Sequence, residues 1–243
     1  WFDVWGQRHS TVDYKRPAEQ LDWMLGQGVS VSMYMFHGGT NFWYMNGANT
    51  AGGYRPQPTS YDYDAPLGEW GNCYPKYYAF REVIQKHLPH GTVLPEVPAD
   101  NPTTTFATIE LKESAPLQAA FHQTTESENV LSMEDLGVDF GYIHYQTTIN
   151  KAGKQKLIIQ DLRDYAVILV DGKQVASLDR RYNQNNVMLD IQKAPATLEI
   201  LVENTGRVNY GPDILFNRKG ITNQVLCGDE KLTGWSITPL PLY

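Results

Sequence analysis

The sequence predicts two architectures in one chain of 243 residues, an α/β segment followed by an antiparallel β-sandwich. In the first 88 residues a helix pattern, a strand pattern, a long loop and a second helix pattern follow one another, which is typical of parallel α/β folds. From residue 103 onward, short β-rich runs recur between turn residues, as in sandwiches. Prolines and a glycine make residues 89–102 an extended linker between the two parts. We therefore expect domains at 1–88 and 103–243, joined by the linker 89–102.

The first helix is predicted to begin near residue 16, after a strand end and loop at residues 1–9. Pro17 is suited to the first helical turn, where its missing N–H costs nothing. Leu21, Met24 and Leu25 recur at the spacing of one helix face, and the glycines that follow end the helix.

A strand, a long loop and a second helix follow. Residues 29–36 alternate at period two and are rich in β-formers, which predicts a strand. Residues 37–71 are polar and aromatic, and loops of that length in a domain are usually functional. The second helix is predicted over residues 75–88. Of the 29 aromatic residues, 18 lie within residues 1–80, and so high a density in one third of the chain needs an explanation.

Strand patterns dominate the second part of the chain. Asp171-Gly172 between two of the runs is the signal of a tight hairpin turn. The predicted strands are 104–111, 142–149, 156–161, 166–170, 187–190 and 197–202.

Composition excludes several classes of protein. A content of 42% hydrophobic and 19% charged residues is that of a chain with a buried core. The formal net charge of -7 would repel nucleic acid and acidic membranes, so neither is expected as a partner. No apolar run approaches the roughly 20 residues of a membrane helix. The first residues are neither a start methionine nor a signal peptide, so we expect the chain to begin inside a longer sequence.

The two cysteines predict no metal centre. Cys73 and Cys227 lie far apart and form neither a CxxC nor a zinc-binding spacing. Two buried free thiols are favoured over a disulfide. No metal and no cofactor are expected.

The run Tyr61-Asp62-Tyr63-Asp64 is the most informative local feature. On an extended segment the two tyrosines share one face and the two aspartates share the other. A tyrosine offers a flat apolar ring and a hydroxyl, the combination that recognises a sugar, although packing of the loop and capping of turns explain the same spacing. Asp62 and Asp64 are poor candidates for a glycosidase pair, because both come from one element rather than from opposite sides of a scissile bond.

Phosphate binding and serine hydrolysis have little support in the sequence. His37-Gly38-Gly39 lacks the remaining glycines and the lysine of a phosphate-binding loop, so a tight turn after the strand is favoured. The sequence has no Gly-x-Ser-x-Gly elbow, so nothing supports serine hydrolysis.

Several longer motifs carry a resemblance to a known family. In order and interval they resemble glycoside hydrolase family 35, the β-galactosidases. The matching stretches are Trp1-Phe2-Asp3-x-Trp5-Gly6-x-x-His9, Tyr34-Met35-Phe36-x-Gly38-Gly39-Thr40-Asn41-Phe42, Asn46-Gly47-Ala48-Asn49, residues 59–67, Met133-Glu134-Asp135-Leu136-Gly137 with Gly141-Tyr142, and Val202-Glu203-Asn204-x-Gly206-Arg207-Val208-Asn209-Tyr210-Gly211.

The resemblance implies a fold and an activity. Residues 1–88 would be the last part of a (β/α)8 TIM barrel, and the β-sandwich would be a jelly roll like galactose-binding domains. The activity implied is hydrolysis of terminal β-galactosides with retention, and the partner is a galactoside-containing oligosaccharide or polysaccharide. Family members are secreted, periplasmic, vacuolar or lysosomal.

The resemblance also implies which residues would take part. Trp1, Tyr34, Tyr61 and Tyr63 match aromatic residues that line the galactose pocket, with Tyr63 the first choice for a hydroxyl contact. The nucleophilic glutamate would lie five residues before Trp1 and the acid/base glutamate further upstream. The 243 residues would then need upstream barrel residues and would be inactive alone.

Departures from the family pattern lie near the expected rim of the pocket. They are Trp43, residues 50–56 and Gly68-Glu69-Trp70, where an acceptor sugar would be read. A non-catalytic alternative is a galactose-binding carbohydrate-binding module. Such a module needs a ring of exposed aromatic residues on the sandwich, and residues 103–243 are comparatively poor in them.

Overall fold

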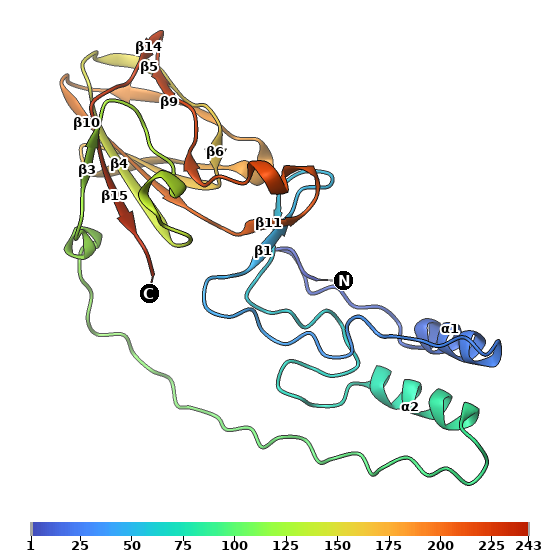
Figure 1. The fold of residues 1–243 in the computed structure, drawn as a ribbon. Helices are drawn as coiled ribbons and strands as arrows, with labels where there is room; N and C mark the ends of the chain where they lie inside the picture. Colours follow the sequence, from blue (N-terminus) through green and yellow to red (C-terminus); the bar gives the residue numbers. More distant parts are fainter. Residues whose placement is uncertain (1, 243) are drawn as a thin grey trace. The chain divides into compact units, whose positions relative to one another are not determined.

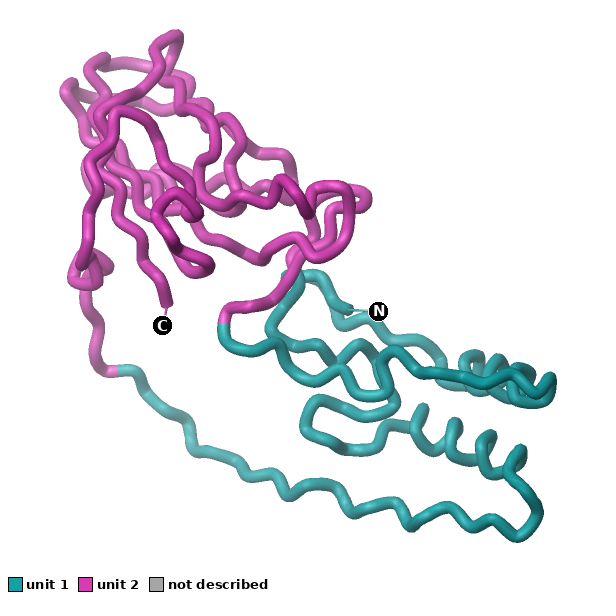
Figure 2. The backbone as a smooth tube through the Cα atoms, in the orientation of Figure 1, with its two compact units in different colours: residues 1–43, 57–111 teal, residues 44–56, 112–243 magenta. Residues whose placement is uncertain are grey.

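The computed structural model describes residues 2–242 and divides the chain into two compact units (Figures 1 and 2). The first unit comprises residues 1–43 and 57–111, and the second comprises residues 44–56 and 112–243. The chain therefore enters the second unit at residue 44, returns to the first at residue 57 and leaves it again after residue 111 (Figure 2). The sequence did not indicate the excursion of residues 44–56.

Two helices form the regular part of the first unit, as the sequence predicts. They are α1 (Lys15–Gly26) and α2 (Pro75–His87), with Pro75 in the first turn of α2. They lie side by side (Figure 1) and pack through Leu21 of α1 and Phe80 of α2, which are 3% and 9% exposed. Leu88 is already extended, because the residue before a proline disfavours helical backbone.

The strand predicted over residues 29–36 is wrong for this structure. The segment has no ladder of backbone hydrogen bonds, and its links to a neighbour begin only at its end. There the amide of Leu67 donates to the carbonyl of Phe36 at 3.1 Å, and His37 bridges Leu67. A strand needs a hydrogen-bonded neighbour, and the alternating sequence cannot supply one by itself.

The second unit is built almost entirely of antiparallel strands. Its larger sheets have the orders β3-β15-β4-β10-β7-β8 and β14-β13-β5-β9. Two small sheets, β11-β1-β2 and β12-β6, complete it. The strands are β1 Gly47–Asn49, β2 Arg55–Pro56, β3 Thr125–Ser127, β4 Tyr142–Ile149, β5 Gly153–Ile159, β6 Leu162–Arg163, β7 Tyr165–Val170, β8 Lys173–Asp179, β9 Asn186–Ile191, β10 Ala196–Glu203, β11 Arg207–Tyr210, β12 Gly220–Ile221, β13 Val225–Cys227, β14 Glu230–Lys231 and β15 Trp235–Leu240.

One hydrophobic core joins the two larger sheets. Along β10, buried residues such as Leu198 and Ile200 alternate with half-buried ones, and Leu157 and Ile159 of β5 belong to the same cluster. Alternation places one face of each strand toward the core. This confirms five of the predicted strands and a mainly β second part. The predicted hairpin at Asp171 is confirmed as well, since Asp171 and Gly172 both have positive φ between β7 and β8.

The strand predicted over residues 104–111 is wrong. Residues 93–116 form neither helix nor strand, and Phe106, Ile109 and Leu111 are between 76% and 92% exposed. The alternation there resembles that of a strand, but no neighbouring strand pairs with it among the described residues.

The excursion of residues 44–56 adds β-structure to the second unit. β1 runs parallel to β11, with Ala48 opposite Val208, and antiparallel to β2. Ala48, Tyr54 and Val208 form a small core of their own. A loop between the predicted strand and helix of the first segment therefore ends as part of a sheet in the second unit.

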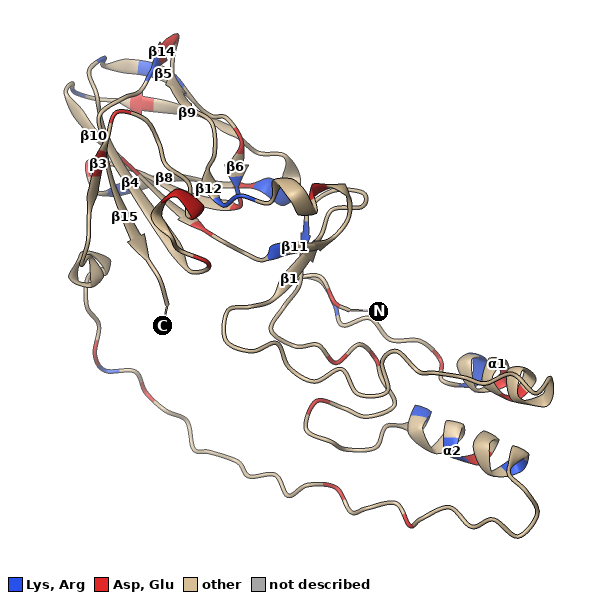
Figure 3. Cartoon of the chain, viewed as in Figure 1, with Lys and Arg blue, Asp and Glu red and all other residues tan. Residues whose placement is uncertain are grey.

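Basic and acidic residues are interspersed over the strands of the second unit (Figure 3). Among residues 2–242, no helix is long and apolar enough to cross a membrane. The same residues contain no group of three or more His, Cys, Asp or Glu side chains that could hold a metal ion. Both cysteines are free thiols, as expected.

Candidate functional site

Three of the four residues expected to line a sugar pocket lie together in the first unit. The Tyr34 and Tyr63 rings meet edge to face with centroids 5.9 Å apart, and the Tyr61 and Tyr63 rings are 5.5 Å apart. The hydroxyls of Tyr34 and Tyr61 are 3.3 Å apart and share a hydrogen bond. Phe2, which the sequence analysis did not select, stacks on Tyr61 at 5.8 Å. Trp1, the fourth expected residue, lies outside the described residues.

Two backbone hydrogen bonds hold Tyr61 and the segment before it against residues 39–41. The amide of Tyr61 donates to the carbonyl of Gly39 at 3.0 Å, and the amide of Asn41 donates to the carbonyl of Thr59 at 2.8 Å. We call the paired segments 39–41 and 59–61 the stem. The stem is the base of the excursion, because residues 44–56 lie between its two segments.

A glycine is required at position 38 because the backbone there lies against the backbone of Tyr61. A Cβ atom at this position would lie 1.7 Å from the carbonyl oxygen of Tyr61. No side chain fits there, so Gly38 permits the close contact on which the position of Tyr61 depends. The expectation of a tight turn at these glycines is consistent with the positive φ of Gly39.

Glu69 fastens both segments of the stem. Its two carboxylate oxygens accept hydrogen bonds from the hydroxyls of Thr40 at 2.7 Å and Ser60 at 2.8 Å. Thr40 and Ser60 also form a β-bridge. Glu69 belongs to the run in which the sequence departs from the expected family pattern. In the structure both of its carboxylate oxygens are hydrogen-bonded within the loop.

Asp62 is 7% exposed, and its carboxylate is occupied by neighbours. It accepts hydrogen bonds from the Tyr74 hydroxyl and the Asp64 amide, both at 3.0 Å. Nε2 of His9 lies 3.3 Å away. This arrangement supports the doubt, drawn from spacing, that Asp62 is an acid or base.

Asp64 is engaged in a separate ion pair. Its Oδ2 lies 2.7 Å from Nζ of Lys76, in the first turn of α2, and accepts a hydrogen bond from the amide of Val12 at 3.0 Å. Tyr63 and Asp64 both have positive φ, 65° and 52°, so the backbone reverses between the tyrosines and the helix. The two aspartates therefore fix the loop and do not face a common open space.

Tyr61 and Tyr63 keep their phenolic protons at physiological pH. Burial raises the pKa of Tyr61, and the hydrogen bond and charge of Tyr34 raise it further. Burial, followed by the charge of Tyr34, also raises the pKa of Tyr63. A phenol that keeps its proton can donate a hydrogen bond as well as accept one.

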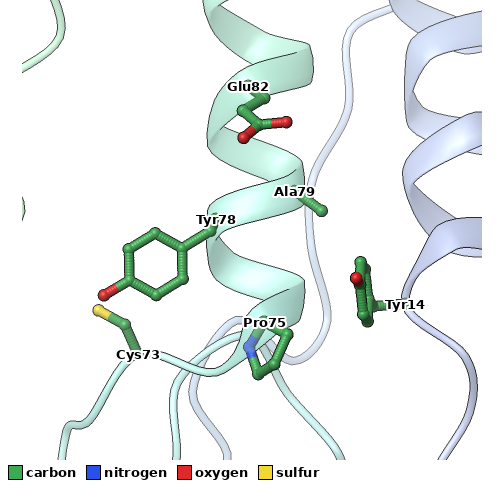
Figure 4. Close-up of a pocket in the computed structure, with 6 residues that line it drawn as sticks. All are labelled: Tyr14, Cys73, Pro75, Tyr78, Ala79 and Glu82. Carbon is green, nitrogen blue, oxygen red and sulfur yellow. The ribbon is translucent and has the colours of Figure 1, made fainter.

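Two pockets in the first unit lie away from this cluster. One of about 310 Å³ is bordered by His9, Asp64, Tyr74 and Lys76, among others. The other, of about 400 Å³, lies beside the start of α2, and Figure 4 shows the Tyr78 ring next to the Cys73 side chain. Burial and the charge of Asp100 raise the pKa of the Cys73 thiol, which disfavours the reactive thiolate. Neither pocket includes Tyr34, Tyr61 or Tyr63.

A buried polar cluster in the second unit holds the excursion, and sequence reasoning missed it. The Tyr54 hydroxyl lies 2.8 Å from Oδ2 of Asp164 and 2.6 Å from the carbonyl oxygen of Gly206. Nζ of Lys219 donates to the same two oxygens at 2.5 and 2.7 Å. Arg180 donates to Oδ1 of Asp164 at 2.9 Å. We call Tyr54, Asp164, Arg180 and Lys219 the buried cluster.

Tyr54, Asp164 and Lys219 of the buried cluster are buried, and Arg180 at its edge is half-buried. Lys219 is 0% and Asp164 is 1% exposed. Burial lowers the pKa of Lys219 to about 8, although the charge of Asp164 opposes the change. At neutral pH Lys219 therefore carries its proton and pairs with Asp164. Tyr54 lies 110 positions before Asp164, and Lys219 lies 55 positions after it. No local motif could therefore have indicated this group.

Comparisons with known proteins match two parts of the chain to two family models. Residues 1–87 match the family model described as glycosyl hydrolases family 35. Residues 130–241 match the model described as beta-galactosidase, first all-beta domain.

Relatives align along the whole chain. A beta-galactosidase of Xanthomonas manihotis is 42% identical over 246 residues, which are 100% of this chain and 41% of the relative. The beta-galactosidases of Mus musculus and Homo sapiens are 41% and 38% identical, and each alignment covers 99% of this chain. It covers 38% of the mouse protein and 36% of the human protein. The chain thus spans about two fifths of the length of these relatives.

Among solved structures, a GH2 beta-galacturonidase from Eisenbergiella tayi, bound to galacturonate, aligns with a TM-score of 0.32 and 19% identity. The alignment covers 48% of this chain and 24% of that one.

Proposed function

This chain belongs to glycosyl hydrolases family 35, and from that premise we propose that it forms part of a retaining β-galactosidase that removes terminal β-D-galactosyl residues. The observation that carries the proposal is the 42% identity to a beta-galactosidase along all of this chain, with the tyrosine cluster inside the matched region. The substrate would be a galactoside-containing oligosaccharide or polysaccharide.

The tyrosine cluster has the chemistry that a galactose subsite requires. Tyr34, Tyr61 and Tyr63 combine ring faces with hydroxyl groups within one patch. Ring faces bury the C–H surface of a sugar, and hydroxyls exchange hydrogen bonds with its hydroxyl groups. In this proposal Tyr61 and Trp1 are walls of the subsite, and the Tyr63 hydroxyl contacts the sugar or the nucleophile.

The two catalytic carboxylates are proposed to come from sequence outside these 243 residues. A retaining glycosidase needs two carboxyl groups about 5–5.5 Å apart on either side of the scissile bond. Asp62 and Asp64 are held by Tyr74 and Lys76, and neither is available for that task. In the same proposal, residues 1–88 complete a (β/α)8 barrel and the β-sandwich is a jelly roll.

The test is an assay of a polypeptide that carries this chain in continuity with an upstream family 35 catalytic segment. We expect hydrolysis of an aryl β-D-galactoside, with the β-anomer of galactose released first, as proton NMR would record. The matched α-galactoside and β-glucoside serve as controls. Absence of β-galactoside turnover, or initial release of the α-anomer, would refute the proposal.

A further inference from the structure

We propose that the buried cluster is a positioning device for the sugar subsite: it grips the end of the loop whose base carries Tyr61. The inference rests on the proposed function for its effect on catalysis. Its mechanical part, that a loop held at its head also keeps its stem ordered, rests on the short chain segments that join head and stem and is tested separately from activity.

The loop has the form of a hairpin with a base and a head. Its base is the stem, where Thr40 and Ser60 form a bridge and the Tyr61 amide bonds to Gly39. Its head is the excursion of residues 44–56, which belongs to the second unit. Two residues separate the stem from the head on each side, residues 42–43 before the head and residues 57–58 after it, so order at the head constrains the stem.

Backbone pairing seats the head in the second unit. β1 pairs with β11 over Gly47–Asn49, and Nδ2 of Asn46 donates to the carbonyl of Thr205 at 2.8 Å. A Cβ atom on Gly206 would lie 2.6 Å from the carbonyl oxygen of Gly47, so the two chains touch without room for a side chain. The pairing of β1 with β11 covers only three residue pairs, and so short a ladder contributes little stability by itself.

The buried cluster adds polar contacts between the head and the rest of the second unit. Tyr54 is the head's contribution, and its hydroxyl lies against Asp164 and the Gly206 carbonyl. Its ring is also covered by cations, with the Arg180 guanidinium 4.3 Å and Lys219 Nζ 4.8 Å from the centroid. Removal of the hydroxyl would leave buried acceptors short of a partner, which costs more than the bond itself contributes.

The charges around Asp164 suit a neutral hydrogen-bond donor such as the Tyr54 hydroxyl. Asp164 is faced by Lys219 and Arg180, and the Thr205 amide donates to it at 3.1 Å. The positive charge on two sides suits a neutral donor, and Tyr54 is one, because burial and the charge of Asp164 raise its pKa well above the ordinary value. A phenol fits the space left between a carboxylate and a buried ammonium.

The experiment compares Tyr54→Phe with Tyr145→Phe in the full-length enzyme. Tyr145 is a matched control: it is fully buried in the same unit, and its hydroxyl also has two backbone partners, Leu131 and Ile221. It has no hydrogen bond to residues 44–56 among those that the structure describes. Both variants lose one buried hydroxyl, so a purely structural effect would be similar in the two.

Two readouts decide the inference. In Tyr54→Phe, we expect the amides of Asn41 and Tyr61 to exchange hydrogen about fivefold faster or more, and kcat/KM for an aryl β-galactoside to fall by a similar factor. The inhibition constant of galactose should rise in parallel, because the subsite loses its order. Tyr145→Phe should change neither readout by more than about twofold, the low end of one net hydrogen bond.

Unchanged exchange at Asn41 and Tyr61 in Tyr54→Phe would overturn the inference, as would faster exchange with unaltered kcat/KM in an active enzyme. If the wild-type enzyme lacks β-galactosidase activity, the proposed function fails, and the exchange readout still decides whether the cluster orders the stem. Should Tyr54→Phe fail to fold, Asn46→Ala removes a different contact of the same head and is expected to give the same two changes.

Discussion

Tyr61 and Tyr63 are two positions apart, yet their hydroxyl groups have different surroundings. The Tyr61 hydroxyl shares a hydrogen bond with Tyr34 at 3.3 Å, whereas Tyr63 meets Tyr34 through its ring. Under the proposed function, the Tyr63 hydroxyl is the one that contacts the sugar or a charged partner. The difference makes the two residues suitable for a direct comparison.

In a full-length enzyme, Tyr63→Phe should lower kcat/KM for an aryl β-galactoside at least about tenfold, because a hydrogen bond to a charged group contributes roughly 1.5–3 kcal/mol. Tyr61→Phe should have a smaller effect, since its bond to Tyr34 lies within the cluster. Steady-state kinetics on both variants measure the contrast. Equal and near-neutral effects would mean that the tyrosines only pack the loop.

Lys219 gives the second unit a distinctive pH dependence. Its pKa in the folded state, about 8, lies below the ordinary value of 10.5. Between these two values the unfolded chain keeps a proton that the folded chain has released, so this residue raises the free energy of unfolding as the pH rises. Below pH 8 both states are protonated, and the contribution is constant.

The measurable quantity is the difference between the wild-type chain and Lys219→Met. From pH 7 to 9.5, the free energy of unfolding of the wild type should gain about 1–2 kcal/mol relative to the variant. At pH 7 the variant should be destabilised by about 3–5 kcal/mol, because Asp164 loses a buried partner. Urea denaturation followed by circular dichroism at both pH values tests this, and a pH-independent difference would contradict it.

At the scale of elements, the stem depends on a glycine rather than on a side chain. Gly38→Ala would place a Cβ 1.7 Å from the carbonyl oxygen of Tyr61, which is impossible without displacing the stem. We expect this change to lower kcat/KM of the full-length enzyme by about 100-fold, the effect of a misplacement of roughly 1 Å in a site. Gly26→Ala, at the end of α1, is the control, since its Cβ would meet only His87 at 3.6 Å.

Wild-type kinetics for Gly26→Ala, together with a large loss for Gly38→Ala, would support the role of the stem. A Gly38→Ala enzyme with an unaltered kcat/KM would show that Tyr61 tolerates displacement, and the assigned subsite would then be wrong.

The elements that the sequence predicts well are those whose signals are local. α1 follows from Pro17 and the spacing around Leu21, and β4 and β10 follow from runs of β-formers. The segment 29–36 carries an equally clear alternation and has no ladder, because the signal describes one strand and pairing needs two. Segment 104–111 fails for the same reason.

The candidate site shows the same division. Tyr34, Tyr61 and Tyr63 could be selected by resemblance, and the structure brings them together. Tyr54, Asp164 and Lys219 could not, because they meet only through the fold. No periodicity or spacing marks a tyrosine in one loop as the partner of a lysine that is 165 positions away.

At the scale of the whole molecule, the proposed function makes a prediction for the 243-residue chain. On its own it should not hydrolyse an aryl β-galactoside above a no-enzyme control, because both carboxylates that the chemistry needs would be absent. Addition of galactose or of a different aryl leaving group should not rescue it. Turnover by the purified chain would require a reassignment of catalysis to Asp62 and Asp64.

Residues 44–56 belong to the second unit although the first unit precedes and follows them in sequence, and this has a consequence for a chain that a protease has cut once. Residues 93–116 form neither helix nor strand and are mostly exposed, so a protease would cut there first. The N-terminal peptide would still contain β1, β2 and Tyr54, which are built into the second unit through β11 and Asp164. A single cleavage would therefore yield two peptides on a denaturing gel but one species in native size-exclusion chromatography. The contacts of residues 44–56 with β11 and Asp164 would hold the two peptides together.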